Sequence, residues 1–369
     1  MKTHSSLELG KKVQGSNMKD VLTEDLEIIS KDEGMKSMSG NTILVTGATG
    51  LIGSLFIKAV LLFNKKSREK IRMIAVIRDF EKARRIFGES FTDSELFWVQ
   101  SDLKDLVDVE FDVDYVIHTA SVTTSKLFVT NPVETIETMY RGTKNILELA
   151  KKKKCKSVVY LSSMEMYGIP DATLDKVREN DLGYIDILNV RSSYSEGKRI
   201  AECLCAAYYE EYGVPVKIAR LAQTFGAGIL PQDNRVYAQF ARSVLEKRDI
   251  ILHTEGKSYG NYCYTTDVIQ ALILLLHRGE NGQAYNVCNE ETTTTIANMA
   301  RMVIQEFGDE SIKVVFDIPE NQKLYGYAPD VKMCLCSEKL RELGWKAQYT
   351  LAQMYERMIG DMLYNQCEK

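Results

Sequence analysis

The segment Thr42-Ile-Leu-Val-Thr-Gly-Ala-Thr-Gly-Leu-Ile-Gly53 joins a short apolar, β-rich run to the start of a helical pattern. Gly47 permits a tight turn, and Gly50 lets backbone N–H groups approach a pyrophosphate. Gly53 allows the helix to pack close to the strand, and the helix N-terminus favours the bound negative charge. Because the glycines lie between a strand and a helix, the segment predicts dinucleotide binding rather than a purely structural turn.

Strand and helix patterns alternate from this segment to about residue 225. The alternation predicts a doubly wound parallel α/β sheet of the Rossmann type. Three regions are expected: an extension with a short helix over 1–40, a dinucleotide-binding domain over 41–225, and a smaller, partly interleaved α+β substrate lobe over 226–369. Strands are expected at 42–46, 72–77, 114–118, 157–161 and 216–219, and helices at 51–63, 134–151, 195–212, 236–246, 267–277, 295–306 and 351–362.

Composition limits the class of protein. The chain has 369 residues, 45% of them hydrophobic, which excludes disorder throughout. Its net charge of −4 disfavours nucleic-acid binding. It has neither an 18-residue apolar run nor an apolar secretory leader, so no membrane association is expected. The eight cysteines form no Cys-x-x-Cys pair, which favours free thiols in a reducing cytoplasm and no metal site.

The extension contains one amphipathic pattern from Met18 to Ile29, with Val21, Leu22 and Leu26 at helical spacing. A helix packed on its own domain and a contact with a partner are the two interpretations.

The residues after the second expected strand bear on cofactor choice. Asp79 could bind the ribose hydroxyls of NAD, whereas Arg78 could meet the 2′-phosphate of NADP. Both cofactors remain open. Asp102 follows later and could reach the adenine edge, or simply cap a turn.

Two further features suggest catalysis. Tyr194 and Lys198 are four residues apart, so a helix places them on one face. The lysine charge is expected to lower the pKa of the tyrosine, which could then act as a base. Ser163 ends an expected strand, where sites of open α/β sheets lie, and could hydrogen-bond a hydroxyl being oxidised.

A set of motifs extends over about residues 41–355. It comprises Gly47-Ala-Thr-Gly-Leu-Ile-Gly53, Asn131-Pro132 with Gly142-Thr143, Ser163 before Tyr167-Gly168, Tyr194 with Lys198, Arg220-Leu-Ala-Gln-Thr-Phe-Gly226, and Tyr262-Cys-Tyr-Thr-Thr-Asp267. With these motifs the chain resembles an extended short-chain dehydrogenase/reductase of the NAD-dependent epimerase/dehydratase family, whose members act on nucleotide sugars.

The resemblance implies roles for individual residues. Tyr194 would take the proton of the sugar 4-OH while hydride leaves C4, Ser163 would assist, and Lys198 would also bind the nicotinamide ribose. The implied cofactor contacts include Thr49, Leu51, Ile52, Leu103, Thr119 and Ala120 beside the glycines, and the implied substrate contacts are Thr123, Gln223, Arg235 and Tyr262.

The residues after Ser163 separate the possible reactions. The 4,6-dehydratases of the family resemble Thr-Asp-Glu here, and this chain has Ser163-Met164-Glu165. A methionine cannot replace the aspartic acid as a proton donor, whereas Glu165 could still act as the base at C5. In the decarboxylases of the family the same place resembles Thr-Ser-Glu, which is closer to the sequence of this chain. The stretch 258–262 lacks the arginine that often binds the substrate diphosphate, and Gln223 replaces a usual asparagine.

Epimerisation or decarboxylation after transient oxidation at C4 is therefore the expected reaction. The alternatives are a reductase or dehydrogenase that exchanges NADPH with solution, a 4,6-dehydratase without the usual acid, and a nucleotide-binding regulatory protein without turnover. The resemblance also implies synthesis of polysaccharide precursors and a homodimer. The candidate dimer stripe on the helix of Tyr194 consists of Ile200, Leu204, Ala207 and Tyr208, which could instead face the core.

Overall fold

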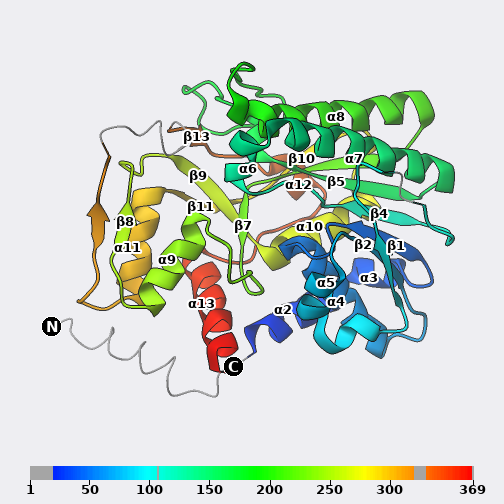
Figure 1. Ribbon diagram of the computed structural model, residues 1–369, viewed down its shortest axis with the longest axis horizontal. Coiled ribbons are helices and arrows are strands. Elements are labelled where there is room, and N and C mark those ends of the chain that lie inside the picture. Colours follow the sequence, from blue (N-terminus) through cyan, green and yellow to red (C-terminus); the bar gives the residue numbers. More distant parts are fainter. Residues whose placement is uncertain (1–19, 106–107, 320–329, 368–369) are drawn as a thin grey trace.

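The computed structural model describes residues 20–105, 108–319 and 330–367, in which seven parallel strands form one sheet in the order β10-β6-β5-β4-β1-β2-β3 (Figure 1). The expected doubly wound α/β fold is confirmed. The strands are β1 (Thr42–Thr46), β2 (Arg72–Ile77), β3 (Leu96–Gln100), β4 (Tyr115–His118), β5 (Ser157–Ser163), β6 (Val216–Leu221) and β10 (Ala284–Val287).

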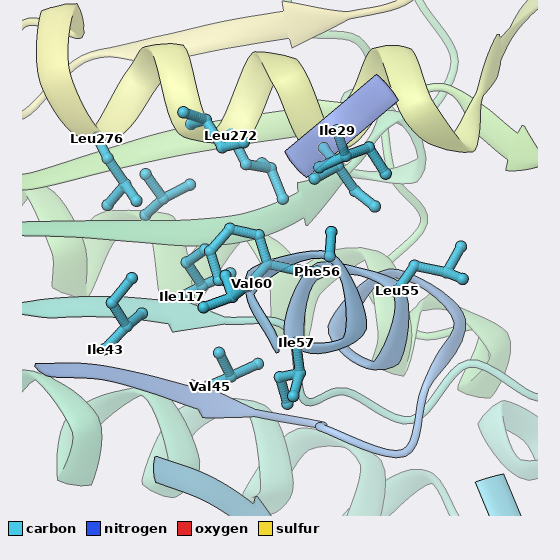
Figure 2. Close-up of a cluster of buried hydrophobic side chains, with 14 of the residues drawn as sticks. Ile29, Ile43, Val45, Leu55, Phe56, Ile57, Val60, Ile117, Leu272 and Leu276 are labelled. Carbon is cyan, nitrogen blue, oxygen red and sulfur yellow. The ribbon is translucent and has the colours of Figure 1, made fainter. Parts of the chain in front are cut away.

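Helices cover both faces of this sheet because strand side chains alternate between the faces. Ile43 and Val45 point into the core formed with α4, α5 and α10, whereas Leu44 belongs to the core beneath α7 and α8. Figure 2 shows Phe56 and Leu272 packed in the first of these cores. The helices are α4 (Leu51–Lys66), α5 (Phe80–Phe87), α6 (Ser125–Thr130), α7 (Pro132–Lys153), α8 (Ser193–Tyr212) and α10 (Thr265–Arg278), and the short 3-10 turns are η1 (Gly88–Thr92), η2 (Met164–Tyr167) and η3 (Val190–Ser192).

A second group of elements lies beside the main sheet, on the left of Figure 1. Strand β9 pairs with β7, β11 and β13, and β8 pairs with β12. The core of this lobe is formed with α9, α11 and α13. The elements are β7 (Gln223–Phe225), α9 (Val236–Leu245), β8 (Ile250–Leu252), β9 (Tyr259–Tyr264), β11 (Asn289–Thr295), α11 (Ile296–Phe307), β12 (Val314–Phe316), β13 (Lys332–Met333) and α13 (Leu351–Cys367). Helix α12 (Glu338–Glu342) instead packs beside β10 of the main sheet.

Three features of the main sheet go beyond the sequence expectations. Strand β3 and helix α5 form after β2, and β10 returns to the sheet from residues 284–287. The last strand pairs with β6 in parallel register, Ala284 opposite Ile218. The C-terminal part of the chain therefore completes the edge of the first sheet.

The expected amphipathic helix of the extension is α2 (Val21–Ser30), followed by α3 (Glu33–Ser37); Met18 lies outside the described residues. Helix α2 packs against α4, α10 and α13, and Ile29 lies in the same core as Leu272 (Figure 2). The helix therefore packs on its own chain. Among the described helices, none combines the length and apolarity needed to cross a membrane.

Candidate active site

One cavity of about 560 Å³ lies at the carboxyl ends of β1, β2, β4, β5 and β6. Ligands of open α/β sheets bind at this edge. Most of the candidate residues line the cavity: Gly47, Thr49, Gly50, Leu51, Ile52, Arg78, Asp102, Leu103, Thr119, Ala120, Thr123, Ser163, Glu165, Tyr194, Lys198, Gln223 and Arg235. The other three candidates, Gly53, Asp79 and Tyr262, do not line it.

The glycine loop has the shape that a pyrophosphate requires. Gly47 has a φ of +64°, and a Cβ at this residue would lie 2.5 Å from Thr119 Oγ1. Gly50 is the N-cap of α4 without a capping side chain, which leaves the first N–H groups of the helix for a ligand. A Cβ at Gly53 would lie 2.6 Å from the carbonyl oxygen of Gly47, so its role is to let helix and loop touch. These residues fit a bound dinucleotide.

The two residues that bear on cofactor choice separate in the fold. Arg78 lines the cavity, together with Lys82. The Asp79 carboxylate instead caps α5 and accepts a hydrogen bond from the backbone N–H of Lys82 at 2.9 Å. Asp102 also lines the cavity and accepts from the N–H of Lys104 at 3.1 Å.

Tyr194 lies almost buried on the cavity wall, at 7% exposure. Its ring stacks on Phe128 of α6, with centroids 4.3 Å apart. Burial raises the pKa of Tyr194, and the Glu165 charge raises it further, while Ser163 lowers it. Burial is the largest of these effects, so the pKa of Tyr194 lies above its ordinary value in the structure without bound ligand.

Lys198 lies near the phenol ring, but its hydrogen bond goes to the backbone. Its Nζ donates to the carbonyl oxygen of Leu161 at 2.7 Å and lies 5.9 Å from the centre of the Tyr194 ring. Burial also lowers the pKa of Lys198 itself to about 8, against the charge of Glu202. The ammonium is thus held by the end of β5 rather than by the phenol.

Glu165 follows β5 in the turn η2, where the Ser163 hydroxyl accepts a hydrogen bond from its N–H at 3.3 Å. Burial raises the pKa of the Glu165 carboxyl, and the nearby Arg191 guanidinium lowers it in part. The site therefore contains a carboxyl group whose proton affinity is raised for acid–base work.

Three of the proposed substrate residues have distinct surroundings. The Arg235 guanidinium is held by Asp233, with its Nε 3.0 Å from both carboxylate oxygens. Gln223 Oε1 is buried without a hydrogen-bond partner among the described residues. Tyr262 packs inside the second lobe against Phe225, because the alternation of β9 turns it into that core.

From the segment after β4, sequence reasoning named Thr119, Ala120 and Thr123 but missed the residues between and beyond them. The segment's position beyond the carboxyl end of a parallel strand was the available signal. It lines the cavity with Ser121, Val122, Thr124, Ser125, Leu127 and Phe128. No described group of three His, Cys, Asp or Glu side chains could hold a metal ion.

A Rossmann sheet with a glycine loop, a Tyr–Lys pair and a strand-end serine on one cavity defines a dinucleotide-dependent enzyme of the short-chain dehydrogenase/reductase type. Residues 43–288 match the model of the NAD dependent epimerase/dehydratase family. The chain belongs to this family of enzymes, and the resemblance found in its sequence is confirmed.

Similar proteins act on nucleotide sugars. UDP-glucuronic acid decarboxylase 6 of Arabidopsis thaliana is 28% identical over 325 residues, covering 88% of this chain and 89% of the relative. The structure of UDP-glucose 4-epimerase from Thermotoga maritima aligns with a TM-score of 0.72 at 20% identity, covering 88% of this chain and 99% of that one. The structure of dTDP-glucose 4,6-dehydratase from Bacillus anthracis aligns with a TM-score of 0.71 at 23% identity, covering 88% of this chain and 97% of that one. The two structures support the fold.

Proposed function

We propose that this chain uses NAD to oxidise a nucleotide-linked hexuronic acid at C4, and that the sugar then loses C6 as carbon dioxide. One observation carries the proposal: Ser163, Glu165, Tyr194 and Lys198 line the same cavity as the glycine loop. The decarboxylase relatives and the Ser163-Met164-Glu165 sequence support loss of carbon dioxide over loss of water.

The chain's own residues would bind the cofactor at two places. The N–H groups at the start of α4 would hold the pyrophosphate beside Gly47 and Gly50, and Lys198 would donate to the nicotinamide ribose. When bound there, NAD would accept the hydride that leaves C4 and return it to C4 after carbon dioxide is lost, so a complete turnover leaves the cofactor unchanged. NADP is a second candidate, because Arg78 lines the cavity whereas Asp79 caps α5.

Tyr194 and Ser163 would handle the proton of the 4-OH. The Tyr194 phenolate would take that proton as hydride leaves C4 and the C4–O bond becomes a carbonyl, and the Ser163 hydroxyl would donate a hydrogen bond to the same oxygen. Since burial raises the pKa of Tyr194, the phenolate forms only with a nearby positive charge, which Lys198 supplies from the next turn of α8.

Glu165 would serve the second step. In a 4-keto hexuronic acid the C5–C6 bond breaks, carbon dioxide leaves, and the bonding electron pair passes into the C4 carbonyl to give an enolate. A protonated Glu165 then gives its proton to C5. Burial raises the pKa of this carboxyl, which favours the protonated form that the step needs.

Mass spectrometry of the products from UDP-, dTDP-, GDP- and CDP-linked hexoses and hexuronic acids tests the proposal. Loss of carbon dioxide from a hexuronic acid, with cofactor retained through turnover, is the expected result. A product of unchanged mass would instead make the protein an epimerase. Reduction that occurs only with added NADPH would favour a reductase.

The Tyr194→Phe variant provides a matched test of the catalytic base. Turnover should fall by about 10²–10⁴-fold with similar NAD affinity, because the phenol no longer carries the proton. Tyr209→Phe, which alters an exposed tyrosine of the same helix, should retain native turnover. Native turnover in Tyr194→Phe would refute the role.

A homodimer through α7 and α8 is a further part of the proposal. These helices pack together, and Ile200 remains 40% exposed on α8, as do Val133 and Ile136 on α7 at 64% and 43%. Tyr208, by contrast, is buried and donates to Glu148, so it faces its own core. Light scattering of Ile136→Asp should show monomers.

We also propose a reducing compartment, the cytoplasm, and a role in making polysaccharide precursors. All eight cysteines are free thiols, which supports the first.

A further inference from the structure

We propose that Arg191 is the positioning residue for Glu165: its guanidinium holds the carboxylate at the cavity wall and stabilises its charged form. The inference rests on the proposed role of Glu165 in the reaction. Arg191 itself is not among the residues that line the cavity.

The two residues join the two elements that build the site. Glu165 lies in η2 directly after β5, and Arg191 lies in η3, three residues before Tyr194 on α8. Arg191 Nη1 lies 3.5 Å from Glu165 Oε2. The side chains are 26% and 32% exposed, so water screens the pair less than a surface ion pair.

The guanidinium of Arg191 has no other carboxylate partner in the described part of the chain. Its Nε is buried and has no hydrogen-bond partner there. The neighbouring Arg199 differs, because it donates to the carbonyl oxygens of Met166 and Gly183 and thereby fixes the backbone. Arg191 is therefore placed to act on Glu165 rather than to tie the fold together.

The charged and titratable groups around Glu165 come from three elements. Arg191 contacts the carboxylate from η3, and the charge of Glu165 acts on Tyr194 of α8. Lys198 of α8 and Arg235, which precedes α9, line the same cavity. Burial raises the pKa of Glu165, and the Arg191 charge and hydrogen bond lower it. Removing Arg191 leaves burial unopposed, so the carboxyl should keep its proton to a higher pH.

Carbon-13 NMR of glutamate labelled at the carboxyl carbon tests this without any turnover. The Glu165 resonance is identified by its loss in Glu165→Gln. In Arg191→Met its titration midpoint should rise by about one pH unit, the low end for an opposite charge at this distance because the pair is partly exposed. Arg191→Lys keeps the positive charge, so its Glu165 midpoint should lie close to that of the native protein. Arg248→Met, which removes an exposed arginine of the second lobe, is the control and should leave the midpoint unchanged.

The turnover of the same variants completes the test. The pH profile of turnover in Arg191→Met should move in the same direction as the NMR midpoint, with Arg191→Lys between it and the native protein. An unmoved Glu165 titration in both Arg191 variants would overturn the positioning role. Native turnover in Glu165→Gln, with the NMR shift still present, would instead overturn the proposed function of Glu165.

Discussion

The ion pair of Asp25 with Arg357 should hold the N-terminal helix to the rest of the protein. Arg357 donates to Asp25 Oδ1 through Nε at 3.1 Å and Nη2 at 2.6 Å, and the Tyr264 hydroxyl donates to Oδ2 at 2.5 Å. Asp25 is only 2% exposed, and the Arg357 side chain is 19% exposed. The bonds connect α2, α13 and the end of β9.

Asp25→Ala should therefore cost about 3–5 kcal/mol of unfolding free energy, because it strands a mostly buried guanidinium and a buried phenol. Arg357 keeps its contacts with Glu24 and the Val21 carbonyl, both at 3.4 Å. These contacts favour a loss near the lower value, about 3 kcal/mol. A loss of about 3 kcal/mol reduces the folded-to-unfolded ratio by more than about 100-fold.

Urea unfolding followed by circular dichroism measures this loss. Glu27→Ala, which breaks an exposed pair with Lys31 on the same helix, should cost at most about 1 kcal/mol. The double variant Asp25→Leu/Arg357→Met should cost less than Asp25→Ala, since no buried charge is left unpaired and the Tyr264 hydroxyl alone loses its acceptor, at about 1–3 kcal/mol. A cost for Asp25→Ala no larger than that of Glu27→Ala, or a double variant that equals the sum of its singles, would refute the reasoning.

Three other changes have defined outcomes. Gly47→Ala places a Cβ 2.5 Å from the nearest side-chain atom at a φ of +64°. Titration calorimetry should therefore show an NAD affinity reduced by at least about 10-fold. Gly88→Ala, at a φ of +52° with open space around it, is the control and should bind NAD normally. Phe128→Ala removes the ring stacked on Tyr194, so we expect a loss of about 3 kcal/mol in stability. The pKa of Tyr194, followed by ultraviolet titration, should fall because the phenol is less buried. An unchanged pKa would contradict the role of burial. Burial raises the pKa of Asp267 to about 7. The protonated side chain therefore makes its full contribution to the stability of the folded protein below about pH 4, and this contribution is lost as the pH rises through 7. Asp267→Asn should remove about 4 kcal/mol of this decline in urea unfolding between pH 4 and pH 8, and parallel pH profiles of the two proteins would contradict it.

Much of the site followed from local sequence. The glycine loop, the strand-end serine and the Tyr–Lys spacing each depend on residues a few positions apart. Parallel strands then bring their carboxyl ends to one edge, which is why Gly50, Ser163 and Tyr194 line a common cavity. The doubly wound sheet followed for the same reason, since alternation of buried strands and amphipathic helices is a local pattern.

Contacts between distant segments were decided only by the tertiary structure. Phe128 covers Tyr194, Arg191 reaches Glu165, and Asp25 meets Arg357 across more than three hundred residues. Strand β10 likewise completes a sheet begun at Thr42. Periodicity reveals which side of an element is buried, but which side chain it meets depends on how whole layers pack. The raised pKa of Tyr194 is the clearest consequence: the sequence showed its lysine, and only the packed structure showed that burial outweighs that charge.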